Sequence, residues 1–307
     1  MWSELELPEA SCAVHDPPDW TLHLASGSPP IYELRALGES LTETGPVRLF
    51  QHAGGYRLTY PDTGSYDISA DGTQIAWYSV PGAPLDLVRA DILGPVLALA
   101  LHVAGVLCLH GSAVALGRSG VAFLGPKGHG KSTLAMALTT AGAALITDDT
   151  LAVDLRPRIM ARPGVHSIRL WWDSAERLGR NGPPDTPPDG TKVGVTNLPE
   201  HLRMAEPMPL QAIYLLEPVH TRGDAAVHRT RLRGVTAALS LIAHSKLGLL
   251  LGEQAAAPLL QGAVALAKAV PVHQLAVVHD FDRLPEVIEQ LLDWHHRAPA
   301  GTTVSCR

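Results

Sequence analysis

The chain has 307 residues, 46% of them hydrophobic, and a formal net charge of −6 at pH 7. A chain of this length and composition can bury one large or two modest hydrophobic cores, so we expect a soluble globular protein. The charges are spread along the sequence, and no run of Lys or Arg is long enough to follow a phosphate backbone. This argues against nucleic acid as a partner.

The cysteines and the N-terminus indicate the compartment. The three cysteines are far apart and lack the spacing of metal ligands: Cys12, Cys108 and Cys306. The first residues, Met-Trp-Ser-Glu-Leu-Glu, lack the basic and then apolar profile of a signal peptide. We therefore expect a cytoplasmic protein.

Residues 1–84 are predicted to form a small β-rich N-terminal domain. Three segments alternate polar and apolar residues, as half-buried strands do, with turn sequences between them: Tyr56–Tyr60, Ser65–Ser69 and Thr73–Tyr78. The sequence Pro81-Gly-Ala-Pro84 marks the end of this unit, so residues 85–307 are predicted to form a second, larger α/β domain.

The larger domain begins with an apolar stretch. The run from Ile92 to Leu109 is long enough to span a membrane, but Gly94 and Pro95 interrupt it, and no membrane partner is expected. Its periodicity instead predicts a buried helix over Leu85–Ala104. Short strands are predicted to follow, the last two joined by a hairpin: Val106–Leu109, Ala113–Leu116 and Val121–Leu124.

The next eight residues, Gly125-Pro-Lys-Gly-His-Gly-Lys131-Ser132, complete the P-loop pattern G-x-x-x-x-G-K-[ST]. Glycines let the backbone turn tightly and point N–H groups at a phosphate, and the helix that follows adds its positive end. Lys131 is expected to supply a charge to the β- and γ-phosphates, and Ser132 a hydroxyl to Mg²⁺. The pattern predicts a nucleotide site made of Gly125, Pro126, Lys127, Gly128, His129, Gly130, Lys131, Ser132 and Thr133.

Two adjacent aspartates, Asp148 and Asp149, follow the short apolar run Ala143–Thr147, which is typical of a strand. A strand, a crossover helix and a second strand of one sheet run parallel, so both carboxyl ends lie at the same edge. If the two strands are neighbours, their ends lie about 5 Å apart, beside the bound phosphates. One carboxylate can then face Mg²⁺ while the other accepts the proton of an incoming hydroxyl. The alternative is an N-terminal cap or a pair of loop residues that face water.

The C-terminal half adds a long loop and several regular elements. Arg180–Gly190 contains four prolines and is predicted to be an exposed loop, either filler or an active-site lid. Lys192 follows it, where a closing lid would bring the ammonium group onto the γ-phosphate. Further strands and helices are predicted at 211–216, 237–244, 255–269, 272–277 and 284–296.

Three segments in this order resemble the catalytic domain of HPr kinase/phosphorylase: Leu109-His-Gly-Ser-Ala-Val114, the P-loop with its flanks, and Leu145-Ile-Thr-Asp-Asp149. They are closer still to the single-function HPr-kinase-like proteins encoded with peptide-modifying pathways, including the kinases that phosphorylate lasso-peptide precursors. The resemblance is clear over about Leu85–Asp154 and weaker beyond. It implies a P-loop α/β catalytic domain of the phosphoenolpyruvate-carboxykinase and HPr kinase type, preceded by the small β-rich domain.

The resemblance also implies an activity, phosphoryl transfer from ATP, with Mg²⁺, to a hydroxyl. The acceptor would be a serine of a peptide or protein, or an alcohol of a natural-product intermediate. Lys131 and Ser132 match the phosphate and metal contacts, and His110 matches a histidine of the family's pocket. The aspartate pair matches the base and metal positions; either order is open, and we favour Asp148 as the base and Asp149 as the metal ligand. Members of the family often oligomerise, so a homo-oligomer is a further expectation.

One departure from the family pattern bears on the direction of the reaction. The family carries Glu-Ile-Arg-Gly where this chain reads Ser167-Ile-Arg-Leu170. Arg169 is retained and either steadies the transferring phosphoryl group or pairs with a surface carboxylate. Loss of the Glu argues against the reverse, phosphorylase reaction. It also favours an alternative function, that of a noncatalytic nucleotide-binding regulator or carrier-peptide binder. The intact Lys131 and the two aspartates argue against this alternative.

Overall fold

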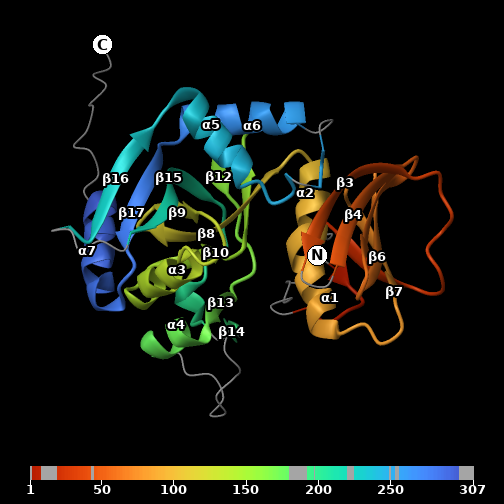
Figure 1. Ribbon diagram of the computed structural model, residues 1–307, viewed down its shortest axis with the longest axis horizontal. Coiled ribbons are helices and arrows are strands. Elements are labelled where there is room, and N and C mark those ends of the chain that lie inside the picture. The colour runs from red at the N-terminus through yellow and green to blue at the C-terminus, as the bar shows by residue number, and fades with distance from the viewer. Residues whose placement is uncertain are drawn as a thin grey trace.

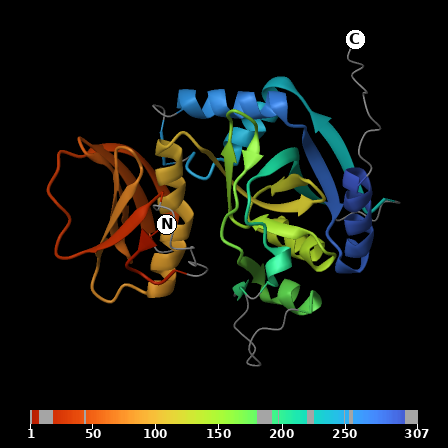
Figure 2. The same ribbon diagram turned by 180° about the vertical axis from the view of Figure 1, so that it is seen from behind.

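The computed structural model describes residues 2–7, 19–42, 45–179, 192–196, 198–219, 225–248, 250–252 and 256–296. An N-terminal β-sheet and a larger α/β body lie side by side, and a helical segment stands between them in both views (Figures 1 and 2). No helix in these ranges is long and apolar enough to cross a membrane.

The N-terminal sheet has seven strands in the order β1-β2-β7-β6-β5-β4-β3. The three predicted strands are confirmed as β5 (Gly55–Tyr60), β6 (Gly64–Ser69) and β7 (Gln74–Ser79), which pair antiparallel. The remaining strands were not predicted from the sequence: β1 (Trp2–Ser3), β2 (Thr21–Ala25), β3 (Arg35–Thr42) and β4 (Gly45–His52).

The predicted buried helix is confirmed as one bent path of three pieces: α1 (Leu85–Asp91), the π-helical turn η1 (Ile92–Val96) and α2 (Leu97–Val103). Its bend lies at Gly94, whose φ and ψ are −99° and −107°, next to Pro95. Residues spaced along one face, including Val88, Ile92 and Leu99, share a buried cluster with side chains of the N-terminal sheet. The helical segment therefore belongs to the core of the N-terminal sheet.

The main sheet runs β10-β8-β11-β12-β15-β17-β16, with β9 between β8 and β15. Its strands are β8 (Leu107–Leu116), β9 (Ser119–Leu124), β10 (Ala144–Thr147), β11 (Thr150–Asp154), β12 (Met160–Ala161), β15 (Met208–Val219), β16 (Val227–Leu232) and β17 (Val272–Val278). A separate two-stranded sheet pairs β13 (Ile168–Trp171) with β14 (Lys192–Val195).

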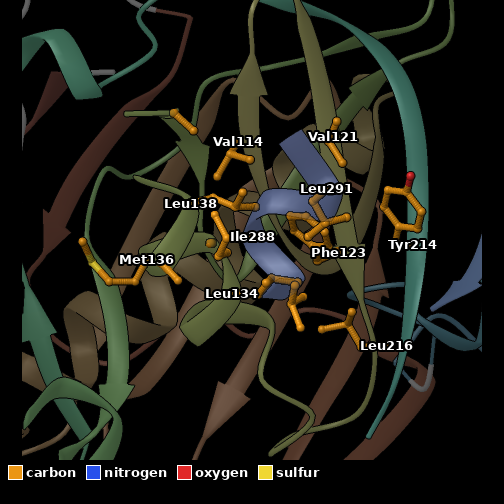
Figure 3. Close-up of a cluster of buried hydrophobic side chains, with 14 of the residues drawn as sticks. Val114, Val121, Phe123, Leu134, Met136, Leu138, Tyr214, Leu216, Ile288 and Leu291 are labelled. Carbon is orange, nitrogen blue, oxygen red and sulfur yellow. The ribbon is translucent and has the colours of Figure 1, made fainter. Parts of the chain in front are cut away.

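Helices cover both faces of the main sheet (Figure 1). They are α3 (Lys131–Thr140), α5 (Gly234–Ala243), α6 (Ala256–Ala269) and α7 (Leu284–His296). The short helix α4 (Trp172–Arg177) packs on β13 and β14 instead, and single 3₁₀ turns lie at Glu200–Leu202 and Phe281–Arg283. Alternation along the strands explains the two faces: Val121 and Phe123 pack toward α3 and α7, and Ala122 and Leu124 toward α5 and α6. Figure 3 shows the first of these two clusters.

The structure corrects two expectations about the strands that carry the site. The two predicted strands Val106–Leu109 and Ala113–Leu116 are one continuous strand, β8, so His110 lies inside a strand and not at its end. The strands before the P-loop and before the aspartates are parallel but not neighbours, because β8 lies between them and pairs antiparallel with both. The aspartates nevertheless reach the P-loop at the shared sheet edge, as the side-chain contacts show.

Candidate functional site

The P-loop joins β9 to α3, as its sequence predicts. Gly125, Gly128 and Gly130 all have positive φ, which an L side chain rarely adopts, and Gly130 directly precedes the first helical turn. These glycines turn the chain so that the N-terminal end of α3 faces a cavity. Backbone N–H groups and the positive helix end at such a place suit a phosphate.

Lys131 is the most buried basic residue of this loop, with 7% of its surface exposed. Its Nζ donates to the carbonyl oxygens of Gly125 and Pro126, at 2.8 and 3.1 Å. Burial lowers the pKa of Lys131 to about 8, although the nearby Asp148 and Asp149 act in the opposite direction. The Lys131 ammonium group therefore lies against the backbone of the P-loop.

Asp148 is buried behind the start of α3. Its Oδ1 accepts from the hydroxyls of Ser112 (2.5 Å) and Ser132 (2.9 Å), and its Oδ2 accepts from the backbone N–H of Arg169 at 3.2 Å. Burial raises the pKa of Asp148, and the charge of Asp149 adds to this, while the hydrogen bonds oppose it. Both carboxylate oxygens therefore have partners, and one lies beside the P-loop hydroxyl.

Asp149 faces the cavity, with 52% of its side chain exposed. Its φ of +70° is unusual for a residue with a side chain and points to a local constraint on the backbone. Oδ2 is bonded to the Nζ of Lys246, and Oδ1 lies 3.3 Å from His110 Nδ1. Partial desolvation alone would raise the pKa of Asp149, but the His110 hydrogen bond and the Lys246 charge outweigh it and hold that pKa well below its usual range.

Lys246 and Ser112 are the two residues of this cluster that we did not predict. Lys246 comes from the segment after α5, where its backbone N–H donates to Cys108 on β8, and only 11% of its side chain is exposed. It belongs to no motif, and 97 residues separate it from Asp149. Ser112 belongs to the segment Leu109–Val114, and the signal that could have identified it is its position two residues after His110 on the same strand face.

A wall of basic side chains lines the same cavity as the aspartates. Lys127 of the P-loop, Arg169 and Trp171 of β13, and Lys192 of β14 all line the same cavity. Trp171 and Lys192 are directly opposed in the β13–β14 pair, and both lysine Nζ atoms lie over the indole ring. Burial lowers the pKa of Lys192, and the charge of Arg169 adds to the shift.

The cavity has a volume of about 330 Å³. Its lining brings together most of the predicted site: His110, Lys127, Gly128, Gly130, Lys131, Ser132, Thr133, Asp148, Asp149 and Arg169. Ala90, Leu93 and Gly94, from the helical segment, form a wall that the sequence did not predict to take part. The site therefore lies between the P-loop and the helices that pack on the N-terminal sheet.

Some predicted residues stand apart from the cavity. Gly125, Pro126 and His129 are not among its lining residues, and His129 Nδ1 contacts the carbonyl oxygen of Leu216 at 3.0 Å. The Pro-rich loop predicted at 180–190 lies outside the described residues. Within the described ranges no three His, Cys, Asp or Glu residues are grouped to hold a metal ion.

Comparisons with known proteins give little beyond the geometry. No protein-family model matches this chain, and no curated protein matches it. Among solved structures, the chain is similar to the HPr(Ser) kinase/phosphatase from Coxiella burnetii, with 12% sequence identity and a TM-score of 0.33, over 62% of this chain and 90% of that one. A likeness of this degree carries no argument about the site, so function rests on the residues described above.

Proposed function

We propose that this protein is an ATP-dependent kinase that transfers the γ-phosphoryl group to a hydroxyl. The acceptor is a serine of a peptide or protein, or an alcohol of a natural-product intermediate, and the reaction runs in the kinase direction only. The observation that carries the proposal is the cluster at the end of the P-loop. There the Ser132 hydroxyl lies 2.9 Å from Asp148, and the Asp149 carboxylate faces the same cavity.

The oxygen atoms at this cluster suit Mg²⁺, which prefers hard oxygen ligands and keeps several waters. Ser132 Oγ and Asp148 Oδ1 adjoin at the cavity, and in the described residues no three His, Cys, Asp or Glu side chains are grouped to hold a metal ion without a ligand. A site of one carboxylate and one hydroxyl, completed by phosphate oxygens, is the usual arrangement for a nucleotide-bound ion. When bound there, Mg²⁺ would neutralise charge on the phosphates.

The contacts favour an exchange of the two aspartate roles favoured from the sequence. Asp148 is enclosed by three hydrogen-bond donors and lies beside Ser132, which suits the metal side. Asp149 is half exposed to the cavity, so it can reach an incoming hydroxyl. We therefore propose Asp149 as the group that accepts the hydroxyl proton.

The proposed transfer is a single displacement at the γ-phosphorus. The acceptor oxygen forms a bond to the γ-phosphorus as its proton passes to Asp149, and the bond from the γ-phosphorus to the β–γ bridging oxygen breaks, which releases ADP. Lys131 and the basic wall of Lys127, Arg169 and Lys192 line the cavity where charge accumulates on the phosphates. Positioning and charge stabilisation account for most of the catalysis in such a reaction.

The proposed single direction is supported by Ser167. Ser167 lines the cavity at the position where the resembling family has a Glu, so a neutral hydroxyl stands there. The reverse reaction would require a phosphorylated product to be attacked by inorganic phosphate, a second anion in the same cavity. The absence of a further carboxylate to hold a second metal ion at Ser167 argues against it.

The test is ADP formation from ATP in the presence of candidate acceptors: serine-containing peptides, a blocked serine amide and simple alcohols. We expect acceptor-dependent ADP formation in the wild type, with the phosphate recovered on the acceptor, and none in Lys131→Ala. Lys268→Ala is a matched control, because Lys268 is exposed on α6 and remote from the cavity lining.

Tight nucleotide binding without transfer to any acceptor would contradict the kinase. If nucleotide then changed the affinity for a protein partner, the alternative of a noncatalytic regulator would replace it. Failure of wild-type protein to bind any nucleotide would remove both functions.

A further inference from the structure

Trp171 lies among the basic side chains of the cavity wall. Trp171 is the last residue of β13, pairs with Lys192 on β14, and directly precedes α4. On β13, Ile168 and Leu170 are buried in the main core, so Arg169 and Trp171 alternate onto the other face. A strand pair on one side and a helix start on the other fix the backbone that carries the indole.

Two ammonium groups gather on this indole. Lys127 Nζ, from the P-loop, lies 5.7 Å from the ring centroid, and Lys192 Nζ lies 5.1 Å from it. A lysine ammonium within about 6 Å of a tryptophan face is attracted by the ring's negative quadrupole. The two lysines lie 65 positions apart in the sequence, and both contact Trp171.

Cationic side chains gather near this ring, and two of them have no ion-pair partner in the part of the chain that the structure describes. Among the described residues, no carboxylate lies within ion-pair distance of Arg169 or Lys192, although both line the cavity. Like charges repel, so a cluster of cations needs either another attractive contact or a bound anion to stabilise it. The indole face supplies the first, and a polyphosphate would supply the second.

We propose that Trp171 is a positioning residue of the phosphate-donor site, which holds Lys127 and Lys192 against the cavity so that both meet the polyphosphate of the nucleotide. This inference rests on the proposed function only in taking a nucleotide as the occupant. The indole contacts the two lysines, so its expected effect is on the phosphates.

The experiment measures the affinity of two probes in the presence of Mg²⁺ by isothermal titration calorimetry. One probe is the non-hydrolysable adenosine (β,γ-imido)triphosphate, and the other is inorganic tripolyphosphate, which has no base or sugar. The variants are Trp171→Leu, Trp171→Phe, and Lys192→Met. Trp172→Leu is the matched control, because Trp172 is the next residue but does not line the cavity.

We expect Trp171→Leu to weaken binding of both probes by about tenfold, and Trp171→Phe, which keeps an aromatic face, by less than about threefold. Lys192→Met is expected to weaken both probes similarly while the tryptophan stays in place, which keeps the test valid if Trp171→Leu fails to fold. Trp172→Leu should leave both affinities unchanged. Probe binding should also change the tryptophan fluorescence of the wild type, and Trp171→Phe should remove most of that change.

Three results would overturn the inference. The first is that Trp171→Leu binds both probes as the wild type does. The second is that it weakens binding of the nucleotide analogue but not of tripolyphosphate, which would make the indole a platform for the base. Equal losses in the Trp171 and Trp172 variants would indicate a general effect on the fold. If the wild type binds both probes and the variants behave as expected, yet no acceptor is ever phosphorylated, the inference stands and the proposed kinase fails.

Discussion

The exchange of roles between the two aspartates can be tested by replacing each with asparagine, which keeps the size and removes the charge. Asp149→Asn removes the proposed proton acceptor and leaves the Ser132–Asp148 contact intact. Loss of a general base costs about 10²- to 10⁴-fold in turnover, or roughly 3 to 5 kcal/mol of barrier. Because Asp149 is itself an anion in the cavity, nucleotide affinity should stay the same or increase.

Asp148→Asn should behave differently because Asp148 is enclosed. Its oxygens accept from two hydroxyls and one backbone N–H, and an amide can present its oxygen to only one side. One buried donor then loses its partner, which costs about 1 to 3 kcal/mol of folding free energy. We expect Mg²⁺-dependent nucleotide affinity to fall by about 10- to 100-fold, as changes around a metal site usually do.

The assay combines calorimetric binding of a non-hydrolysable ATP analogue, with and without Mg²⁺, and single-turnover ADP formation at saturating nucleotide. Our reasoning is refuted if Asp149→Asn loses Mg²⁺-dependent binding while Asp148→Asn binds normally and fails only in turnover. That outcome would restore Asp148 as the base and Asp149 as the metal ligand.

Three further predictions concern neighbouring groups. Ser112→Ala removes a fully buried donor to the Asp148 carboxylate, and urea unfolding should show a loss of about 1.5 to 3 kcal/mol; a loss below about 0.5 kcal/mol would contradict the hydrogen bond. Lys246→Met removes the ion pair with the Asp149 carboxylate, and turnover should fall about tenfold or more while nucleotide affinity is retained. Lys246→Arg should keep most of the activity. Equal activity in the wild type and both variants would count against a positioning role for Lys246. Burial raises the pKa of Asp91 from 3.8 to about 6, so the folded protein binds this proton more tightly than the unfolded chain, and the associated stability, full below pH 4, is lost as the pH rises through about 6. Thermal unfolding should therefore show Asp91→Asn to be more stable than wild type by roughly 1 to 2 kcal/mol at pH 7 and equal to it at pH 4, whereas a constant difference would exclude the linkage.

Local sequence patterns were sufficient to predict many of the helices, strands and turns of this protein. The P-loop was predictable because the turn, the glycines and the helix start are encoded within eight consecutive residues, whose conformations depend mainly on near neighbours. The hairpin into β9 and the terminal helix α7 were predictable for the same reason, since apolar periodicity is a short-range signal. The same signal failed at β8, where the polar His110-Gly-Ser112 within an otherwise apolar strand was read as an end.

Which side chains meet around the P-loop depends on contacts between distant parts of the chain. The order of strands placed β8 between β9 and β10, and the strand pairing of the segment after α5 with β8 brought Lys246 to Asp149. Trp171 contacts both Lys127 and Lys192, which belong to two separate elements. Such contacts join residues far apart in the chain, and their formation depends on packing of whole sheets and helices rather than on any local preference. The local sequence was therefore enough to predict the P-loop, and packing sets which charged side chains surround it.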